Sequence, residues 1–270
     1  MHDAAVPIEP IAAAPSSRIG LVGFGASHIN AITQAFKEAR TPHAALLDIA
    51  VLHFRERVYK PLLVTRAGKR AVNDKLDAAL SLRIEEKRPP FLFCSLLGGT
   101  YAVHGLVNHP QPFRIFLPAS HDACGEATPA TAYVIPFDVV AAMFERKTET
   151  VYTLLAAVME KTRLPIYQIC PPPPIGEEEH IRQRPGTLDV SLIDRLGIAP
   201  PALRRALWLA LSDVMRRRCR ALGVYFIEPP AAAVDEAGYL RSAYYSTDPI
   251  HANSRYGDLV LHQLAEIAGA

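Results

Sequence analysis

Apolar positions along this chain follow two alternating patterns. Short continuous apolar runs are typical of strands buried on both faces of a parallel sheet, and segments with apolar residues three or four positions apart are typical of helices. The runs predict strands at residues 19–22, 44–54, 91–97, 113–117, 166–170 and 224–227. The periodic segments predict helices at residues 28–40, 72–87, 201–222 and 259–267, with one or two more within 137–163. This alternation predicts an α/β fold with a mainly parallel sheet of about five strands.

Two segments interrupt the alternation. Residues 1–17 contain three prolines and no apolar core segment, so we expect a flexible lead-in without a secretory signal. Four consecutive prolines, Pro171 to Pro174, end the strand at 166–170, since neither a strand nor a helix interior tolerates them. The composition does not change beyond them, and we therefore expect an ordered loop over the sheet edge and a single domain over residues 18–270.

Composition excludes several classes of protein. Lys and Arg number 29 against 27 Asp and Glu, a net charge of +2, which is far from that of a globally basic nucleic-acid binder. The longest apolar runs fall short of the ~20 residues of a membrane span. The four cysteines stand far apart without a C-x-x-C pair, so we expect no disulfide framework, no metal, no cofactor and a cytoplasmic location.

The turn after the first predicted strand has two interpretations. Gly23 and Gly25 could begin a dinucleotide-binding G-x-G-x-x-G motif, but His28 stands where the third glycine belongs. Alternatively, Ser27 is a nucleophile exposed at the carboxyl edge of the sheet, near a helix N-terminus that favours developing negative charge. A third, purely structural interpretation is that Ser27 only caps the helix.

A polar turn near the C-terminus favours the nucleophile. Asp248 and His251 are three residues apart, so a single turn can direct both side chains at one sheet edge. A serine nucleophile needs a base to take its proton, and that base needs a carboxylate to orient it. Ser27, His251 and Asp248 supply these three roles, although Asp248 and His251 could also be only a turn acid and a helix-capping histidine.

These residues together resemble the SGNH (GDSL-like) hydrolase superfamily. The stretch from Gly25 to His28 is similar to the first block of that family, and the stretch from Asp248 to His251 is similar to its last block, D-x-x-H. The resemblance implies a flavodoxin-like three-layer α/β/α sandwich and a Ser-His-Asp acyl-transfer mechanism. The sequence departs from the pattern at Ala26, where the family has an aspartate.

The oxyanion-binding groups are less clear from the resemblance. Gly99 and Thr100 fall at the third block, G-x-N, where Thr100 replaces the asparagine whose amide would bind the oxyanion. The single glycine of the second block is assigned to Gly68. His28 could face the substrate, or it could be a partly buried histidine bonded to a nearby loop. Three residues of the following loop could replace the missing amide: Tyr101, His104 and Asn108.

The favoured function is therefore a serine esterase acting on a small ester, with an acylated carbohydrate as a substrate class that the resemblance makes plausible. The alternatives are an acyltransferase acting on a glycan, and a binding protein of the same fold with impaired catalysis. The arginine-rich stretch from Arg216 to Arg220 is interpreted as a solvated helix face. The more specific alternative is that it binds an anionic ligand or an acidic partner. The oligomeric state stays open.

Overall fold

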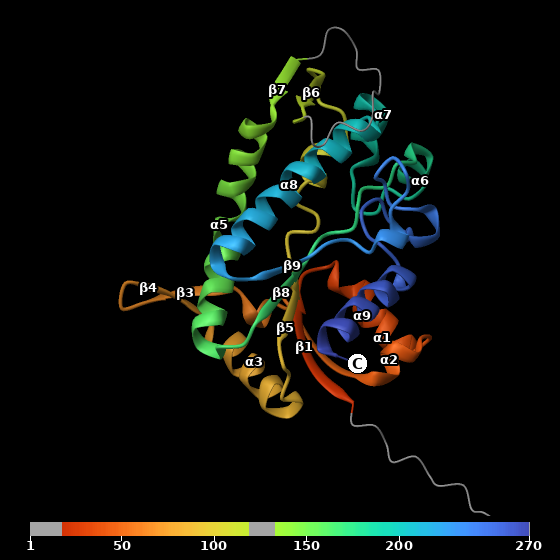
Figure 1. Cartoon of the computed structure of the whole chain (residues 1–270). Helices are drawn as coiled ribbons and strands as arrows, with labels where there is room; N and C mark the ends of the chain where they lie inside the picture. The colour runs from red at the N-terminus through yellow and green to blue at the C-terminus, as the bar shows by residue number, and fades with distance from the viewer. Residues whose placement is uncertain (1–17, 119–132, 270) are drawn as a thin grey trace, which may run out of the picture.

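A five-stranded parallel sheet forms the centre of the molecule (Figure 1). The computed structural model describes residues 18–118 and 133–269, so the expected lead-in at 1–17 lies outside the described residues. The strand order is β2-β1-β5-β8-β9, and each neighbouring pair is parallel. The strands are β1 (Ile19–Gly25), β2 (Leu47–His53), β5 (Leu92–Ser95), β8 (Ile166–Ile169) and β9 (Tyr225–Ile227). The expected α/β class with about five parallel strands is confirmed.

Successive residues of the central strands belong to different cores. In β1, Leu21 packs into one hydrophobic cluster, and its neighbour Val22 packs into the other. In β5, Phe93 belongs to the first cluster, and Leu92 belongs to the second. Because side chains alternate between the faces of a strand, a sheet covered on both sides needs apolar residues at every position. The continuous runs in the sequence follow from this requirement.

Helices cover both faces and make three layers (Figure 1). On one side lie α1 (Ile29–Glu38), the short α2 (Pro42–Leu46) and α9 (Ser254–Ala268). On the other lie α3 (Asp74–Lys87) and the single long helix α5 (Phe137–Thr162). Helix α8 (Pro201–Leu222) packs on α5 and contributes to both clusters. Short helices complete the described chain: η1 (Arg57–Tyr59), α4 (Ala102–Gly105), α6 (Glu178–Gln183), α7 (Val190–Leu196), η3 (Ala231–Ala233) and η4 (Ser242–Tyr244).

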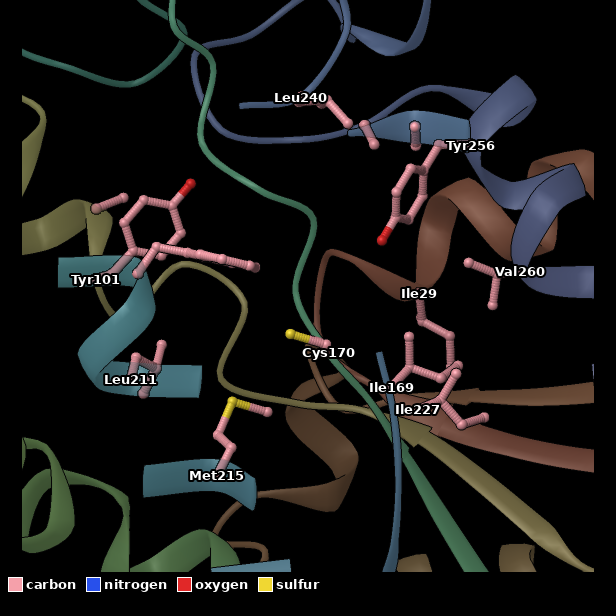
Figure 2. Close-up of a cluster of buried hydrophobic side chains, with 14 of the residues drawn as sticks. Ile29, Tyr101, Ile169, Cys170, Leu211, Met215, Ile227, Leu240, Tyr256 and Val260 are labelled. Atoms are coloured by element: carbon pink, nitrogen blue, oxygen red, sulfur yellow. The ribbon is translucent and has the colours of Figure 1, made fainter. Parts of the chain in front are cut away.

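The first cluster extends beyond the sheet. Figure 2 shows Tyr101, Leu211 and Met215 on one side of Cys170, and Ile29 and Tyr256 on the other. The apolar core therefore connects α8 with α1 and α9 across the carboxyl ends of the strands.

Four local predictions were incomplete or wrong. The run at 44–54 begins as helix α2, whose first residue is Pro42, and becomes strand β2 only at Leu47. The last helix begins at Ser254 rather than at residue 259, because the Asn253 side chain accepts hydrogen bonds from two N–H groups of its first turn. The strand expected at 113–117 exists as β6 (Phe113–Phe116) but pairs with β7 (Tyr133–Pro136), outside the central sheet. The hairpin of β3 (Leu63–Arg66) and β4 (Lys69–Val72) was missed.

Buried polar contacts hold the proline segment after β8. The guanidinium of Arg204 is 1% exposed and donates to the carbonyl oxygens of Ile175 and Gly176 at 2.9–3.2 Å, and also to that of Ala199. The Trp208 indole donates to the Pro171 carbonyl at 3.1 Å. These donors from α8 satisfy carbonyl oxygens along and after the proline segment and so hold the segment in place. The expected ordered loop is confirmed.

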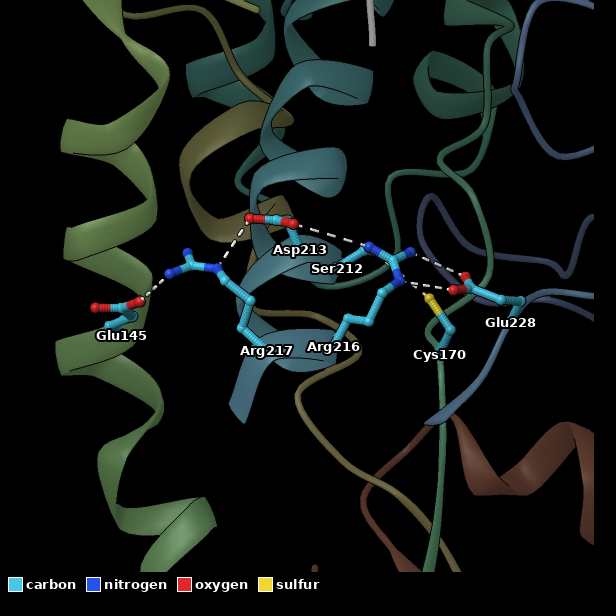
Figure 3. Close-up of polar contacts among 7 residues, drawn as sticks. All are labelled: Glu145, Cys170, Ser212, Asp213, Arg216, Arg217 and Glu228. Atoms are coloured by element: carbon cyan, nitrogen blue, oxygen red, sulfur yellow. Dashed lines mark hydrogen bonds and ion pairs between the residues drawn. The ribbon is translucent and has the colours of Figure 1, made fainter. Parts of the chain in front are cut away.

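Acidic residues of this chain neutralise the arginine-rich part of α8 (Figure 3). Arg216 makes two hydrogen bonds to Glu228, at 2.7 and 3.1 Å. Arg217 bridges Asp213 on its own helix and Glu145 on α5. Partly exposed pairs of this kind contribute little individually, but they give α8 partners on its solvent side. These contacts favour the solvated-face interpretation over an anionic ligand.

Within the described residues, no helix combines the length and apolarity that a membrane span requires.

Helices α1 and α9 approach each other closely at a glycine. A Cβ added to Gly257 of α9 would lie 2.1 Å from the Ala31 carbonyl oxygen of α1. Such a distance is below any van der Waals contact, so only glycine permits this helix spacing.

We therefore expect Gly257→Ala to destabilise the protein by about 1–3 kcal/mol, although alanine is the better helix former. Urea unfolding measures this change. Gly105→Ala is the matched control, because its new methyl would meet only the flexible end of the Leu207 side chain. Equal stability of Gly257→Ala and wild type would contradict the assigned contact.

Candidate active site

The candidate site lies at the carboxyl edge of the sheet, where β1 ends. Gly25 is the last residue of β1, and α1 begins at Ile29, so Ser27 occupies the sharp turn between strand and helix. Ser27 is partly exposed. The N-terminal residue of α1 receives no side-chain cap, and the Ser27 hydroxyl makes no hydrogen bond to a described residue. The interpretation of Ser27 as only a helix cap is therefore not supported.

Asp248 organises the turn that carries His251. One carboxylate oxygen accepts hydrogen bonds from the backbone N–H groups of Ile250 at 3.0 Å and His251 at 2.9 Å. The same carboxylate lies 2.8 and 2.9 Å from Nδ1 of the His251 ring. Burial alone would raise the pKa of Asp248, but these hydrogen bonds and the charge of His251 outweigh it and lower the pKa to about 2. The carboxylate is thus ionised and fixes Nδ1 as the protonated ring nitrogen.

This arrangement leaves Nε2 of His251 as the acceptor nitrogen. Nε2 is buried and has no hydrogen-bond partner among the described residues. The ring of His28, the residue after Ser27, lies with its centroid 4.4 Å from that of His251. The structure thus brings the serine turn and the Asp248–His251 turn together, although it contains no hydrogen bond between Ser27 and His251. Contacts of this kind are often loose before substrate binds.

The loop after β5 contributes the third side of the site. A Cβ on Gly98 would lie 2.0 Å from Cδ2 of His28, and one on Gly99 would lie 3.5 Å from Cδ1 of Ile250. Leu97, which directs the chain into this loop, has a φ of 66°, a left-handed conformation rare for a branched side chain. The Thr100 N–H donates to the Leu97 carbonyl at 3.0 Å and closes the turn. Gly99 therefore lies beside the turn that carries Asp248 and His251, and Thr100 follows it.

Gly68 does not belong to this site. It lies at the tip of the β3–β4 hairpin, with a φ of 77° and open space around its Cα. Figure 1 places this hairpin beside α3 and α5, on the opposite side of the sheet from α1 and α9. The glycine serves the positive φ of a tight hairpin turn, so its assignment as an oxyanion donor is wrong.

One of the three loop residues considered in place of the missing amide is hydrogen-bonded elsewhere, and the other two lie near or within apolar surroundings. The Asn108 side-chain amide donates to the Ile198 carbonyl at 3.1 Å. The His104 ring lies 6.2 Å from that of Phe144 on α5. Tyr101 is 1% exposed and packs in the first hydrophobic cluster.

Three residues that were given no catalytic role from the sequence also border the site. Arg55 follows β2, and its charge is close enough to contribute to the lowered pKa of His28. His180 of α6 contacts the Asp248 carbonyl through Nε2 at 3.3 Å. A Cβ on Gly186 would lie 3.4 Å from that of Asp248, so the long loop after the prolines packs against the Asp248–His251 turn. The length of that loop was the only sequence signal for this contact.

A cavity of about 520 Å³ lies next to the candidate site in the chain, and its lining does not include Ser27, Asp248 or His251. Its walls come from α1, the end of β2 and the segment around His251, and most of its side chains are polar. The lining residues are Asn30, Ala31, Thr33, Gln34, Lys37, His53, Ser246, Ala252, Asn253 and Ser254. The volume suits a small ligand, and the polar walls suit one rich in hydroxyl groups.

The dinucleotide interpretation finds no support in this geometry. An acid that binds ribose should lie at the end of β2, but that strand ends at His53. Asp48 is the second residue of β2 and forms an ion pair with Lys87 at 2.7 Å. In the described part of the chain, no three His, Cys, Asp or Glu side chains cluster so as to hold a metal ion.

Comparison with known proteins gives structural similarity only. No family model matches the chain, and no curated protein matches it. The periplasmic domain of a lipopolysaccharide acetyltransferase from Salmonella ser. Paratyphi A is 11% identical over 94% of this chain and 85% of its own, with a TM-score of 0.48. A candidate SGNH hydrolase from Slackia heliotrinireducens is 10% identical over 94% and 100%, with a TM-score of 0.48. A GDSL-like lipase from Bacteroides thetaiotaomicron is 11% identical over 93% and 89%, with a TM-score of 0.39.

The burial of His28 predicts that the free energy of unfolding depends on pH. Burial first, and then the neighbouring His251, lower its pKa to about 3, so the folded protein excludes a proton that the unfolded chain binds below about pH 6.5. Stability is therefore lost as the pH falls. Between pH 7 and pH 5 this single group costs about 2 kcal/mol.

We expect His28→Phe to remove this loss, which urea unfolding at both pH values measures. His109→Phe changes an exposed imidazole and should keep the wild-type pH dependence. A His28→Phe protein that loses as much stability as wild type would show that His28 titrates normally.

Proposed function

We propose that this protein is a serine acyl hydrolase or acyltransferase with an SGNH-type active site. The observation that carries the proposal is the position of the Asp248–His251 pair against the Ser27 turn. Asp248 is ionised and bound to Nδ1 of His251, and Nε2 is left without a partner among the described residues. This is the orientation that a histidine needs to take a proton from a serine hydroxyl.

The proposed reaction proceeds in two acyl-transfer steps. Ser27 Oγ attacks the carbonyl carbon of an ester, and its proton passes to Nε2 of His251. The resulting imidazolium, stabilised by Asp248, then protonates the leaving alcohol. In the second step water or an acceptor hydroxyl attacks the acyl-enzyme, and His251 repeats the same proton transfers.

The backbone supplies part of the oxyanion site in this proposal. The Ser27 N–H has no hydrogen-bond partner among the described residues and precedes helix α1, whose N-terminus favours negative charge. Gly99 and Thr100 lie on the loop that borders the same turn. A threonine hydroxyl there can donate one hydrogen bond but is shorter than an asparagine amide.

The neighbouring cavity supports a small, polar substrate. Its walls include the Asn30 amide and the Ser246 hydroxyl, and such groups suit hydroxyl-rich partners such as an acylated sugar. The same property favours acyl transfer to a sugar hydroxyl as a second candidate outcome of the reaction. A binding protein with impaired catalysis is the alternative that the Thr100 substitution motivates.

Active-site titration with a fluorophosphonate tests the proposal. We expect one label per wild-type chain and none in Ser27→Ala. Ser246→Ala is the matched control, because it removes a hydroxyl that lines the neighbouring cavity and leaves Ser27 in place. Absence of labelling in folded wild-type protein would rule out an activated serine and leave the binding-protein alternative.

Asp248→Asn tests the role of the carboxylate. The amide leaves no charge to stabilise the imidazolium and no longer fixes its tautomer, so we expect kcat to fall by about 10³–10⁴-fold with KM little changed. Steady-state hydrolysis of p-nitrophenyl acetate measures both constants. A loss below about tenfold would remove Asp248 from the triad.

A further inference from the structure

His28 is a buried polar side chain beside the candidate site, and both of its ring nitrogens lack a hydrogen-bond partner in the described part of the chain. It is 7% exposed, and neither Nδ1 nor Nε2 has a partner among the described residues. An imidazole always carries at least one N–H, and a buried donor without an acceptor is unfavourable. A ligand oxygen that accepts this hydrogen bond would remove that penalty.

Three walls of the candidate site meet at the His28 ring. It follows Ser27 directly in the chain, and its centroid lies 4.4 Å from that of His251. A Cβ on Gly98 would lie 2.0 Å from its Cδ2 and 2.5 Å from its Nε2, so this edge of the ring packs against the loop after β5. The ring therefore borders the nucleophile turn, the base and the third loop at once.

Burial keeps the imidazole of His28 neutral. It is the largest cause that lowers the pKa to about 3; His251 and Arg55 act in the same direction, and only Asp248 favours a positive charge. At neutral pH a group with such a pKa is a poor general base. It still donates an N–H, and a neutral imidazole can polarise a carbonyl without transferring its proton.

We propose that His28 is an oxyanion donor of this active site, whose neutral imidazole N–H binds the carbonyl oxygen of the ester. The proposal rests on the proposed function, since it takes Ser27 as the nucleophile. As Ser27 Oγ bonds to the carbonyl carbon, the C=O electron pair moves onto oxygen, and the Ser27 proton moves to His251. His28 keeps its proton and stabilises the negative oxygen until the double bond re-forms and the alcohol departs with the proton from His251.

This assignment accounts for two other features of the site. The Asn108 amide already donates to the Ile198 carbonyl, and the His104 ring lies near that of Phe144 on α5. Thr100 has only a short hydroxyl. The His28 imidazole supplies a long, rigid donor from the nucleophile side of the site.

A matched pair of variants tests the proposal. His28→Gln and His28→Met place unbranched side chains of similar length at the same site, and only glutamine can donate a hydrogen bond. We expect kcat for p-nitrophenyl acetate to fall about 100–1000-fold in His28→Met, with KM within about threefold, and to recover at least tenfold in His28→Gln. His104→Phe should behave as wild type.

A second readout separates donation from packing. A trifluoromethyl ketone forms a hemiketal oxyanion with a serine nucleophile, so its affinity should fall in His28→Met in proportion to kcat/KM.

Three results would overturn the proposal. Equal losses in His28→Met and His28→Gln would mean that the ring only fills space, and activity within threefold of wild type in His28→Met would mean that it is dispensable. Wild-type protein that neither turns over the ester nor reacts with a fluorophosphonate would instead refute the proposed function, and the role of His28 with it. If the His28→Met protein does not fold, the kcat of His28→Gln relative to wild type becomes the deciding measurement. A loss of kcat above 100-fold in His28→Gln would then contradict the proposal.

Discussion

The contact between α1 and α9 is the constraint on which the candidate site depends. Each helix begins a few residues after one half of the site: Ser27 precedes α1, and His251 precedes α9. Because Gly257 lets α9 approach the backbone of α1, the turns at their N-termini are also held together. Two segments from opposite ends of the chain thus form one site through helix packing, without a hydrogen bond between Ser27 and His251.

The main features of the fold could be predicted because the sheet is buried on both faces. Continuous apolar runs of the kind found in β1 and β5 are typical of such strands, and they indicated all five strands of the central sheet. The errors in the predicted elements arose where a local signal, such as a proline or a helix cap, differed from the apolar pattern. Pro42 starts a helical turn where apolar composition alone favoured a strand, and the Asn253 cap starts α9 one turn earlier than its apolar spacing indicates. The β3–β4 hairpin is short and largely polar, so it carried little periodic signal.

The triad candidates could be found because catalysis constrains residue type and spacing within single turns. The chain places Asp248 and His251 three residues apart, and the predicted hydrogen bond between them is present. Oxyanion groups are harder to predict, because a backbone N–H can belong to any residue. Gly68 was selected because it is a glycine, but a glycine is needed there for the positive φ of a hairpin turn. The burial of His28 depends on Gly98, 70 positions away, and no local pattern records such a contact.

The packing of His28 against Gly98 has a consequence for how this site can diverge. The imidazole occupies the volume into which any side chain at position 98 would extend. A lineage could acquire a larger residue at position 98 only after position 28 had become small. Likewise, a chain with a larger residue at position 98 could regain a histidine at position 28 only after position 98 had returned to glycine. The two positions should therefore covary among descendants of this protein, and a chain that retains the histidine should also retain the glycine.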